Sequence, residues 1–377
     1  MSLVKPFRAL RYDPERAGPL ESVVAPPHDV VRPGQREELH EASPYNAIRL
    51  TRPDDPEEAG RLFHAWIEEG VLVREAEPAV WILEETYTGP DGAERTRRSL
   101  VARVRMSRYG EGEVFPHERT FRRQKQFRLE LLRATRTKLS PVFFLHDGST
   151  PAHPEGPPDL EAAFEGVASR LWRVSEPAAV AAALALVRGP LIIADGHHRY
   201  ETALRFHEEN GTEETAYVLG VLVAHDDPGL EIFPTHRLAG PPVPKPNGRF
   251  RLTELPGGAA DGLARLGELP RDRPAFVLVH RGGATLAETD PVADGPAGEL
   301  DTAVLDELGL DDVRFTPSAE EAEQAVASGE AAAAFLVRAP TVAQVEAVAL
   351  AGETMPQKST YFFPKLTSGL LFAPFDE

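Results

Sequence analysis

The chain has 377 residues, of which 42% are hydrophobic, enough to bury a substantial core in two lobes. Its 41 lysines and arginines face 59 acidic residues, and the formal net charge of −18 argues against a broad contact with duplex nucleic acid, which needs clustered cations. The chain has no cysteine, which excludes disulfides, thiolate nucleophiles and cysteine-based metal sites.

No apolar run approaches the ~20 residues that cross a bilayer. The first residues show no long apolar stretch or cleavage site of a signal peptide. We therefore expect a cytoplasmic protein with no membrane partner.

The predicted elements of the first 150 residues are a polar helix over residues 33–42, an amphipathic helix and a β-hairpin. In the amphipathic helix, over residues 54–70, Leu62, Phe63, Trp66 and Ile67 recur at helical spacing. The hairpin consists of predicted strands at residues 79–87 and 97–105 with a Gly-rich turn between them. A basic helix at 124–136 and a strand at 139–145 follow.

The rest of the chain predicts alternating strands and helices. A proline-rich stretch at residues 151–158 precedes an alanine-rich helix. Strands are predicted next at 191–193 and 217–223, with a helix between them at 201–209 that ends at Gly211. A Pro/Gly-rich linker follows at 240–248. Beyond it we expect strands near 250, 276–279 and 333–337 and helices near 305 and 342.

This order predicts an α/β (or α+β) protein with two lobes. We expect a core lobe over residues 1–240, a second, smaller α/β lobe over 241–352, and a C-terminal segment over 353–377 that folds back onto the site.

The most reactive segment is the box Asp195-Gly196-His197-His198-Arg199-Tyr200. Gly196 permits a tight turn, and the helix start after it offers unpaired N–H groups and a positive dipole end, which suit a phosphate. Arg199 and Tyr200 are candidate phosphate ligands, and the two imidazoles can transfer protons or bind metal. Asp195 can hold a divalent cation such as Mg²⁺. An N-capping Asp195 before solvated polar residues is the simpler alternative, but four reactive groups in five positions favour function.

His117 and Glu118 follow a proline and suit general acid–base work or a metal site. Phe121 stands where a zinc-protease motif would have its second histidine. The basic residues after this pair either hold a multiply charged nucleotide or form a solvated helix face; they are Arg122, Arg123, Lys125, Arg128 and Arg133.

Other candidates lie in turns and in the tail. His28 and Asp29 stand in a proline-set turn that is either structural or part of an active-site loop. Thr235-His236-Arg237 is predicted at a strand end, where α/β sheets gather ligand groups. The remaining candidates for phosphate binding or charge neutralisation are Asn46, Arg49, Lys358, Ser359, Thr360 and Lys365.

Together these motifs resemble the bacterial and archaeal family known as domain of unknown function 1015, over nearly the whole chain. That family more often has tyrosine at the position of His28. The shorter Asp-Gly-His-His-Arg box is similar to that of the ParB and sulfiredoxin superfamily, which includes archaeal free-serine kinases. This resemblance implies a ParB/sulfiredoxin-like mixed-sheet core in which Gly196, His197, His198 and Arg199 hold nucleotide phosphates, with ATP or ADP as a cofactor. Members of the family are similar to proteins that are often encoded near serine-biosynthesis enzymes, and this resemblance implies serine or phosphoserine as a substrate.

The leading hypothesis is therefore phosphoryl transfer or phosphate-ester chemistry on a small hydroxy-amino acid, by a kinase or a phosphatase. No Walker loop or kinase catalytic loop decides the direction. Two alternatives stay open. One is a nucleotide-dependent ParB-like regulatory protein, and the other is a metal-dependent hydrolase in which His117, His197, His198 and His236 converge on one ion. The sequence does not indicate the oligomeric state.

Overall fold

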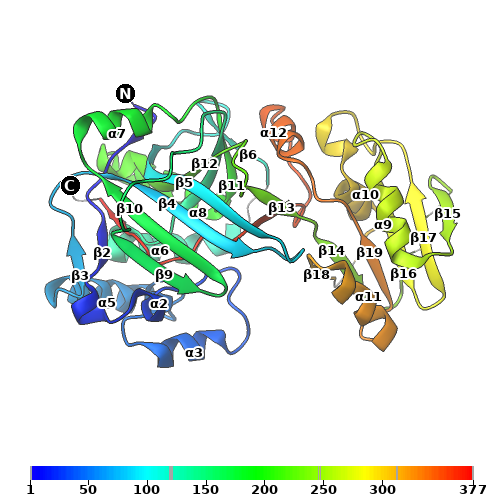
Figure 1. Ribbon diagram of the computed structural model, residues 1–377, viewed down its shortest axis with the longest axis horizontal. Coiled ribbons are helices and arrows are strands. Elements are labelled where there is room, and N and C mark those ends of the chain that lie inside the picture. Colours follow the sequence, from blue (N-terminus) through cyan, green and yellow to red (C-terminus); the bar gives the residue numbers. More distant parts are fainter. Residues whose placement is uncertain (1, 119–121, 245, 247, 311–312, 376–377) are drawn as a thin grey trace.

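The computed structural model describes residues 2–118, 122–244, 246, 248–310 and 313–375, and of residues 122–125 the main chain alone. Two separate β-sheets organise the chain, and Figure 1 shows them side by side along the long axis of the molecule. Both chain ends lie on the side of the larger sheet (Figure 1). These observations confirm the predicted α/β class with two units. Among the described helices, none is long and apolar enough to cross a membrane.

The larger sheet has nine strands and is mixed. Its parallel pairs are β6 with β11 and β8 with β12, and its other pairs are antiparallel. In spatial order the strands are β6 (Val114–Pro116), β11 (Leu191–Asp195), β8 (Val142–His146), β12 (Tyr217–Ala224), β5 (Glu94–Arg105), β4 (Val80–Thr88), β10 (Val167–Val174) and β9 (Leu160–Phe164), with β1 (Val4–Lys5) beside β5.

The larger sheet has an apolar cluster on each face. Successive side chains of a strand point to opposite faces, so one strand contributes to both clusters. In β8, Val142 and Phe144 join an apolar cluster with α7 (Pro177–Leu184) and α8 (His197–Asn210). Phe143 and Leu145 join a cluster with Phe362 of the C-terminal segment and with α12 (Val342–Leu350).

A group of helices lies beside this sheet and includes the predicted helices at 33–42 and 54–70. In α5 (Pro56–Glu68), Gly60 lies close to α6 (Arg122–Thr135). A Cβ atom on residue 60 would stand 2.8 Å from the carbonyl oxygen of Ala134. The helices are α1 (Pro14–Ala17), α2 (Leu20–Val23), α3 (Gln35–Ala42), α4 (Ile48–Thr51), α5 (Pro56–Glu68) and α6 (Arg122–Thr135); β2 (Leu10–Tyr12) pairs with β3 (Leu72–Arg74) nearby.

The second sheet is antiparallel throughout. In β16, Val277 and Val279 face α9 and α11, whereas Phe276 and Leu278 join the cluster of α10 on the other face. In spatial order its strands are β15 (Arg251–Leu255), β17 (Gly283–Glu288), β16 (Ala275–His280), β19 (Ala333–Leu336), β14 (His236–Ala239) and β18 (Arg314–Thr316). Its helices are α9 (Gly258–Glu268), α10 (Asp301–Glu307) and α11 (Ala319–Ser328).

After α12 the chain returns to the larger sheet. β20 (Tyr361–Phe363) pairs with β13 (Glu231–Phe233), and β21 (Ala373–Pro374) pairs with β7 (Thr137–Lys138). β14 lies before residue 240 in the chain but belongs to the second sheet. The domain boundaries at residues 240 and 352 stay a proposal.

The sequence prediction omitted a hairpin. β9 and β10 form it over residues 160–174, between the proline-rich stretch and the alanine-rich helix, which is α7. β9 has the sequence Leu-Glu-Ala-Ala-Phe, which lacks β-branched residues, so its strand conformation depends on pairing with β10 rather than on local preference. The prediction also omitted α9, α11, β17 and β18.

Candidate functional site

The predicted order of strand, tight turn and helix at residues 191–200 is confirmed. β11 ends at Asp195, Gly196 adopts a left-handed conformation with φ of 97°, and α8 begins at His197. A Cβ atom on residue 196 would stand 3.1 Å from the guanidinium of Arg199. Glycine is therefore required both by the backbone angle and by Arg199, whose side chain folds back over the turn.

Two cations hold Asp195. Nη2 of Arg199 donates to Oδ2 of Asp195 at 2.7 Å, and Nζ of Lys365 donates to Oδ1 at 3.3 Å. Arg199 also donates through Nη1 to the carbonyl of Pro141. Burial disfavours the charged carboxylate, but Lys365 and Arg199 outweigh it and hold the pKa of Asp195 below its usual range. A metal ion at Asp195 would have to displace one of these cations.

His117 and His197 form a buried pair with ring centres 4.7 Å apart. Nδ1 of His117 lies 2.7 Å from the carbonyl oxygen of Ile193, so this nitrogen carries the proton, and Nε2 lies 3.2 Å from the hydroxyl of Thr360. The main-chain N–H of His117 donates to Nε2 of His197 at 3.3 Å. Burial lowers the pKa of His117 to about 4 and lowers that of His197 well below its usual value. Both rings are therefore neutral at neutral pH.

Glu118 lies at the same sheet edge as Asp195. β6 and β11 are parallel, with Pro116 opposite Ile193, so Glu118 and Asp195 each lie two positions beyond this pair. Burial, followed by the negative charge of Asp195, raises the pKa of Glu118 to about 7. A carboxyl group with this pKa exchanges its proton readily at neutral pH.

The loop with His28 and Asp29 also lies at this site. Burial and the charges of Arg128 and Arg199 lower the pKa of His28 to about 2, so this ring stays neutral. Nδ1 of His28 lies 3.8 Å from Oδ1 of Asp29, whose side chain is half-exposed. The negative charge of Asp29 also acts on Lys365. Segments far apart in the sequence therefore surround the box.

Three predicted phosphate ligands form hydrogen bonds to the main chain within the fold. The amide of Asn46 is fully buried and donates to the carbonyls of Ser22 and Val24. Nη2 of Arg49 donates to the carbonyl of His40 near the end of α3. Tyr200 is buried, and its hydroxyl exchanges two 2.8 Å hydrogen bonds with the main chain of Ser107.

The structure places two further candidates in strand β14. His236 lies in the second sheet, where Nδ1 accepts from the N–H of Val337, and the group of potential metal ligands found among the described residues does not include it. Arg237 donates to the carbonyl of Lys358, 3.2 Å away, and ties β14 to the C-terminal segment.

In that segment one predicted residue touches the buried histidine pair and two do not. Ser359 is buried and hydrogen-bonds to Thr302 and to the carbonyl of Pro356. The side chain of Lys358 is exposed, although its charge acts on Glu118. Thr360 contacts His117, as described above.

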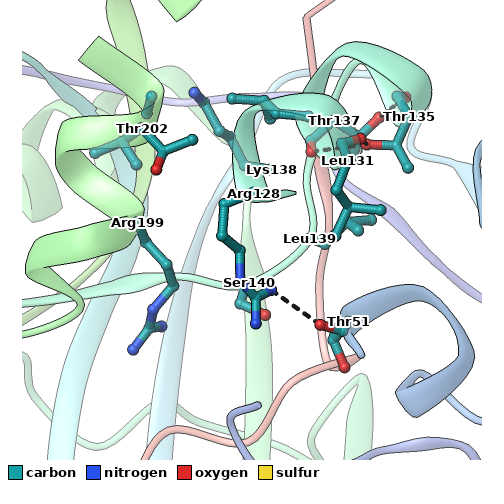
Figure 2. A pocket seen from close by; sticks show the side chains of 13 residues that line it. Thr51, Arg128, Leu131, Thr135, Thr137, Lys138, Leu139, Ser140, Arg199 and Thr202 are labelled. Atoms are coloured by element: carbon teal, nitrogen blue, oxygen red, sulfur yellow. Dashed lines mark hydrogen bonds between the residues drawn. The ribbon is translucent and has the colours of Figure 1, made fainter. Parts of the chain in front are cut away.

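Sequence reasoning missed a pocket next to the box, between α6 and α8 (Figure 2). Arg128 and Arg199 line it together with Lys138, Ser140 and Thr202. Arg128 stood out only as one member of a basic run, and no sequence motif pointed to Lys138 or Thr202. Of that run, Arg133 pairs with Glu209 at 2.7 Å, and the side chains of Arg122, Arg123 and Lys125 lie outside the described residues, as do Arg119 and Thr120.

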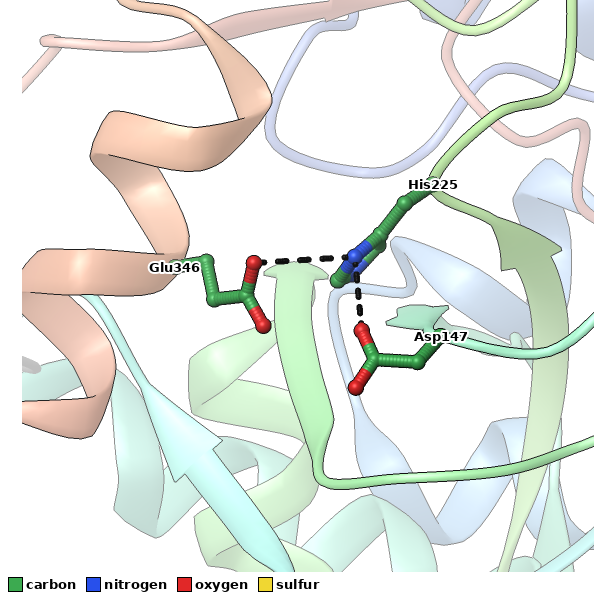
Figure 3. A group of neighbouring side chains, drawn as sticks. All are labelled: Asp147, His225 and Glu346. Carbon is green, nitrogen blue, oxygen red and sulfur yellow. Dashed lines mark ion pairs between the residues drawn. The ribbon is translucent and has the colours of Figure 1, made fainter.

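A separate group with metal-ligand chemistry lies at the opposite edge of the larger sheet, where β8 and β12 end. Nδ1 of His225 lies 3.0 Å from Oδ1 of Asp147 and 3.7 Å from Oε2 of Glu346, and Figure 3 shows both carboxylates turned toward the imidazole. Among the described residues, this is the group whose three ligand atoms come within 4.8 Å of one another. The arrangement serves equally as an ion-pair network that holds α12 to the sheet.

Fold and site define a mixed α/β protein with buried histidines and opposed charges at one edge of its larger sheet. The family model described as "Protein of unknown function (DUF1015)" matches residues 4–302, and the chain belongs to this family.

A structure of free serine kinase in complex with AMP is 16% identical, with a TM-score of 0.40, and the match covers 67% of this chain and 85% of that one. A conserved hypothetical protein from Pyrococcus furiosus is 17% identical over 67% and 89%, with a TM-score of 0.39. SbnI from Staphylococcus aureus is 12% identical over 73% and 82%, with a TM-score of 0.35. The comparison with curated proteins found no match.

Proposed function

We propose that this protein catalyses phosphoryl transfer or phosphate-ester hydrolysis on a small hydroxy-amino acid of the serine or phosphoserine type. The observation that carries the proposal is the position of Glu118, a carboxyl group with a pKa of about 7, at the same sheet edge as Asp195, which Lys365 and Arg199 hold. A proton acceptor next to fixed positive charge is what attack on a phosphate requires.

In this proposal Glu118 accepts the proton of the attacking hydroxyl. That hydroxyl belongs to the amino acid in the kinase direction and to water in the phosphatase direction. Lys365 and Arg199 stabilise the charge that develops on the phosphoryl oxygens, and Asp195 fixes the positions of both cations. His117 and His197 hold the framework, because both ring nitrogens of His117 and Nε2 of His197 have partners inside the protein. We assign the leaving group to His198, which precedes Arg199 in α8.

The proposed cofactors are a nucleotide, ATP or ADP, for the kinase direction and Mg²⁺ with the phosphate. Carboxylate oxygens suit Mg²⁺. Either Asp195 would hold the ion in place of one of its two cations, or Glu118 would hold it in a mechanism in which Glu118 is not the base. A bound Mg²⁺ would supply further charge neutralisation at the phosphate.

The direct experiment is to incubate the purified protein with phosphoserine, with and without Mg²⁺, and to measure released phosphate. In parallel, serine with ATP or ADP is tested for phosphoserine by mass spectrometry. Glu118→Gln should abolish either activity, and the matched variant Glu111→Gln, in an exposed loop, should keep it. No turnover in any of these mixtures would contradict the proposal, and nucleotide binding without turnover would favour the regulatory alternative.

A further inference from the structure

The pocket between α6 and α8 has two facing walls. On α6 it is lined by residues three to four positions apart, which share one helix face. On α8 it is lined by Arg199, Thr202 and Ala203, again at helical spacing. The α6 residues are Arg128, Leu131, Leu132 and Thr135, and residues 137–140, Thr51 and Val218 complete the lining (Figure 2).

Two guanidinium groups share this pocket. Arg128 donates through Nη1 to the carbonyl oxygen of Thr51 at 2.9 Å, and within the described part of the chain it forms no ion pair with a carboxylate. Burial, with the like charge of Arg199, lowers the pKa of Arg128 to about 10, while the half-exposed Asp29 opposes this shift. Arg128 is therefore a partly buried cation whose charge the neighbouring groups balance only in part.

The walls also offer unused polar groups. The hydroxyls of Thr51 and Thr202 have no hydrogen-bond partner among the described residues, although these residues are only 1% and 4% exposed. The same holds for Nζ of Lys138, which lies 4.6 Å from the centre of the Phe375 ring. A buried polar group without a partner destabilises the fold, so a ligand that binds these donors recovers part of that cost.

We propose that this pocket binds a phosphate group, with Arg128 and Arg199 as a two-arginine clamp and Thr202 as a hydroxyl donor. The proposal rests on the proposed function, because it names the place where the phosphate of the substrate or nucleotide lies. Two planar guanidiniums can each give N–H donors to phosphate oxygens, and their positive charges favour an anion between them. Arg199 contacts both Asp195 and the pocket, so a phosphate bound there lies next to the reacting groups.

Binding of inorganic phosphate to the full-length protein, measured by calorimetry in a buffer of constant ionic strength, tests the clamp directly. Arg128→Ala should weaken binding by about 10- to 100-fold, as expected for loss of a hydrogen-bonded charge. Thr202→Val, which keeps the side-chain volume, should weaken it by about fivefold. The matched control is Arg133→Ala, on the same helix but paired with Glu209 and 44% exposed, which should bind phosphate like the wild type.

Each outcome separates this inference from the proposed function. If the wild type does not bind phosphate, or if Arg128→Ala and Thr202→Val both bind it as tightly as the wild type, the clamp is wrong, and a loss of turnover in Glu118→Gln would still support the proposed function. If phosphate binds through Arg128 but no phosphate ester is turned over, the clamp stands and the proposed function fails. If circular dichroism shows that Arg128→Ala is unfolded, Arg128→Lys and Thr202→Val decide, since both keep the wall intact.

Discussion

Nζ of Lys365 lies 3.3 Å from Oδ1 of Asp195, although 170 positions separate the two residues in the chain. Lys365 follows β20, which pairs with β13, and Asp195 ends β11. This contact joins the C-terminal segment to the turn at Gly196. The site is therefore complete only when the last part of the chain has returned to the larger sheet.

Replacing Asp195 tests this contact. Asp195→Asn leaves Lys365 and Arg199 as mostly buried cations without their carboxylate, so we expect the free energy of unfolding to fall by about 2–4 kcal/mol at pH 7. The measurement is urea denaturation followed by circular dichroism. Because the pKa of Asp195 is lowered in the folded protein, its contribution is present above the unfolded pKa of about 3.9 and disappears as pH falls below that value.

The control for this variant is an exposed ion pair. Glu208 bonds to Arg108 at 2.7 Å, and these side chains are 42% and 62% exposed. Glu208→Gln should change stability by less than about 1 kcal/mol, because exposed pairs contribute little. Equal losses in the two variants would show that Asp195 is no more important than a surface carboxylate.

Glu118→Gln should separate activity from stability. The raised pKa of about 7 means that the folded protein keeps a proton on Glu118 that the unfolded chain releases near pH 4.3. Glu118 therefore reduces the stability of the wild type as pH rises from about 4.3 to 7. We expect the variant to be inactive, yet more stable than the wild type by about 1–3 kcal/mol at pH 8 and equal to it at pH 4. Unfolding curves at both pH values check this, and a variant less stable at pH 8 would contradict it.

The sequence predicted the local structure of the box well because strong local signals determine it. The apolar strand β11 and Gly196 mark the start of α8, and Gly211 marks its end. All three lie where the sequence predicts them. Long-range pairing determines the rest. The hairpin of β9 and β10 was missed because β9 lacks β-branched residues. The roles of Asn46 and Tyr200 depend on main-chain partners that no sequence pattern shows.

Substitution of Gly196 measures how closely Arg199 approaches the turn. Gly196→Ala introduces strain at φ of 97° and a Cβ atom 3.1 Å from the guanidinium, whereas Gly211→Ala introduces strain at φ of 69° with nothing within 4 Å. We expect about 1 kcal/mol of destabilisation in Gly211→Ala from the backbone alone, and a larger loss in Gly196→Ala. Phosphate binding should weaken only in Gly196→Ala, because only that variant displaces Arg199. Equal behaviour of the two variants in calorimetry would refute the role of this close approach.

The buried neutral state of His117 gives a prediction about acid stability. Its pKa of about 4 lies below the unfolded value of about 6.5, so between these pH values the unfolded chain binds a proton that folded His117 does not. Stability should therefore fall as pH decreases from 6.5 to 4, with His117 contributing up to one proton to the slope. His117→Gln removes this titration, so its free energy of unfolding, though lower at pH 7, should change less across this range. A His117→Gln slope as steep as the wild type's would show that burial does not hold His117 neutral in the folded protein.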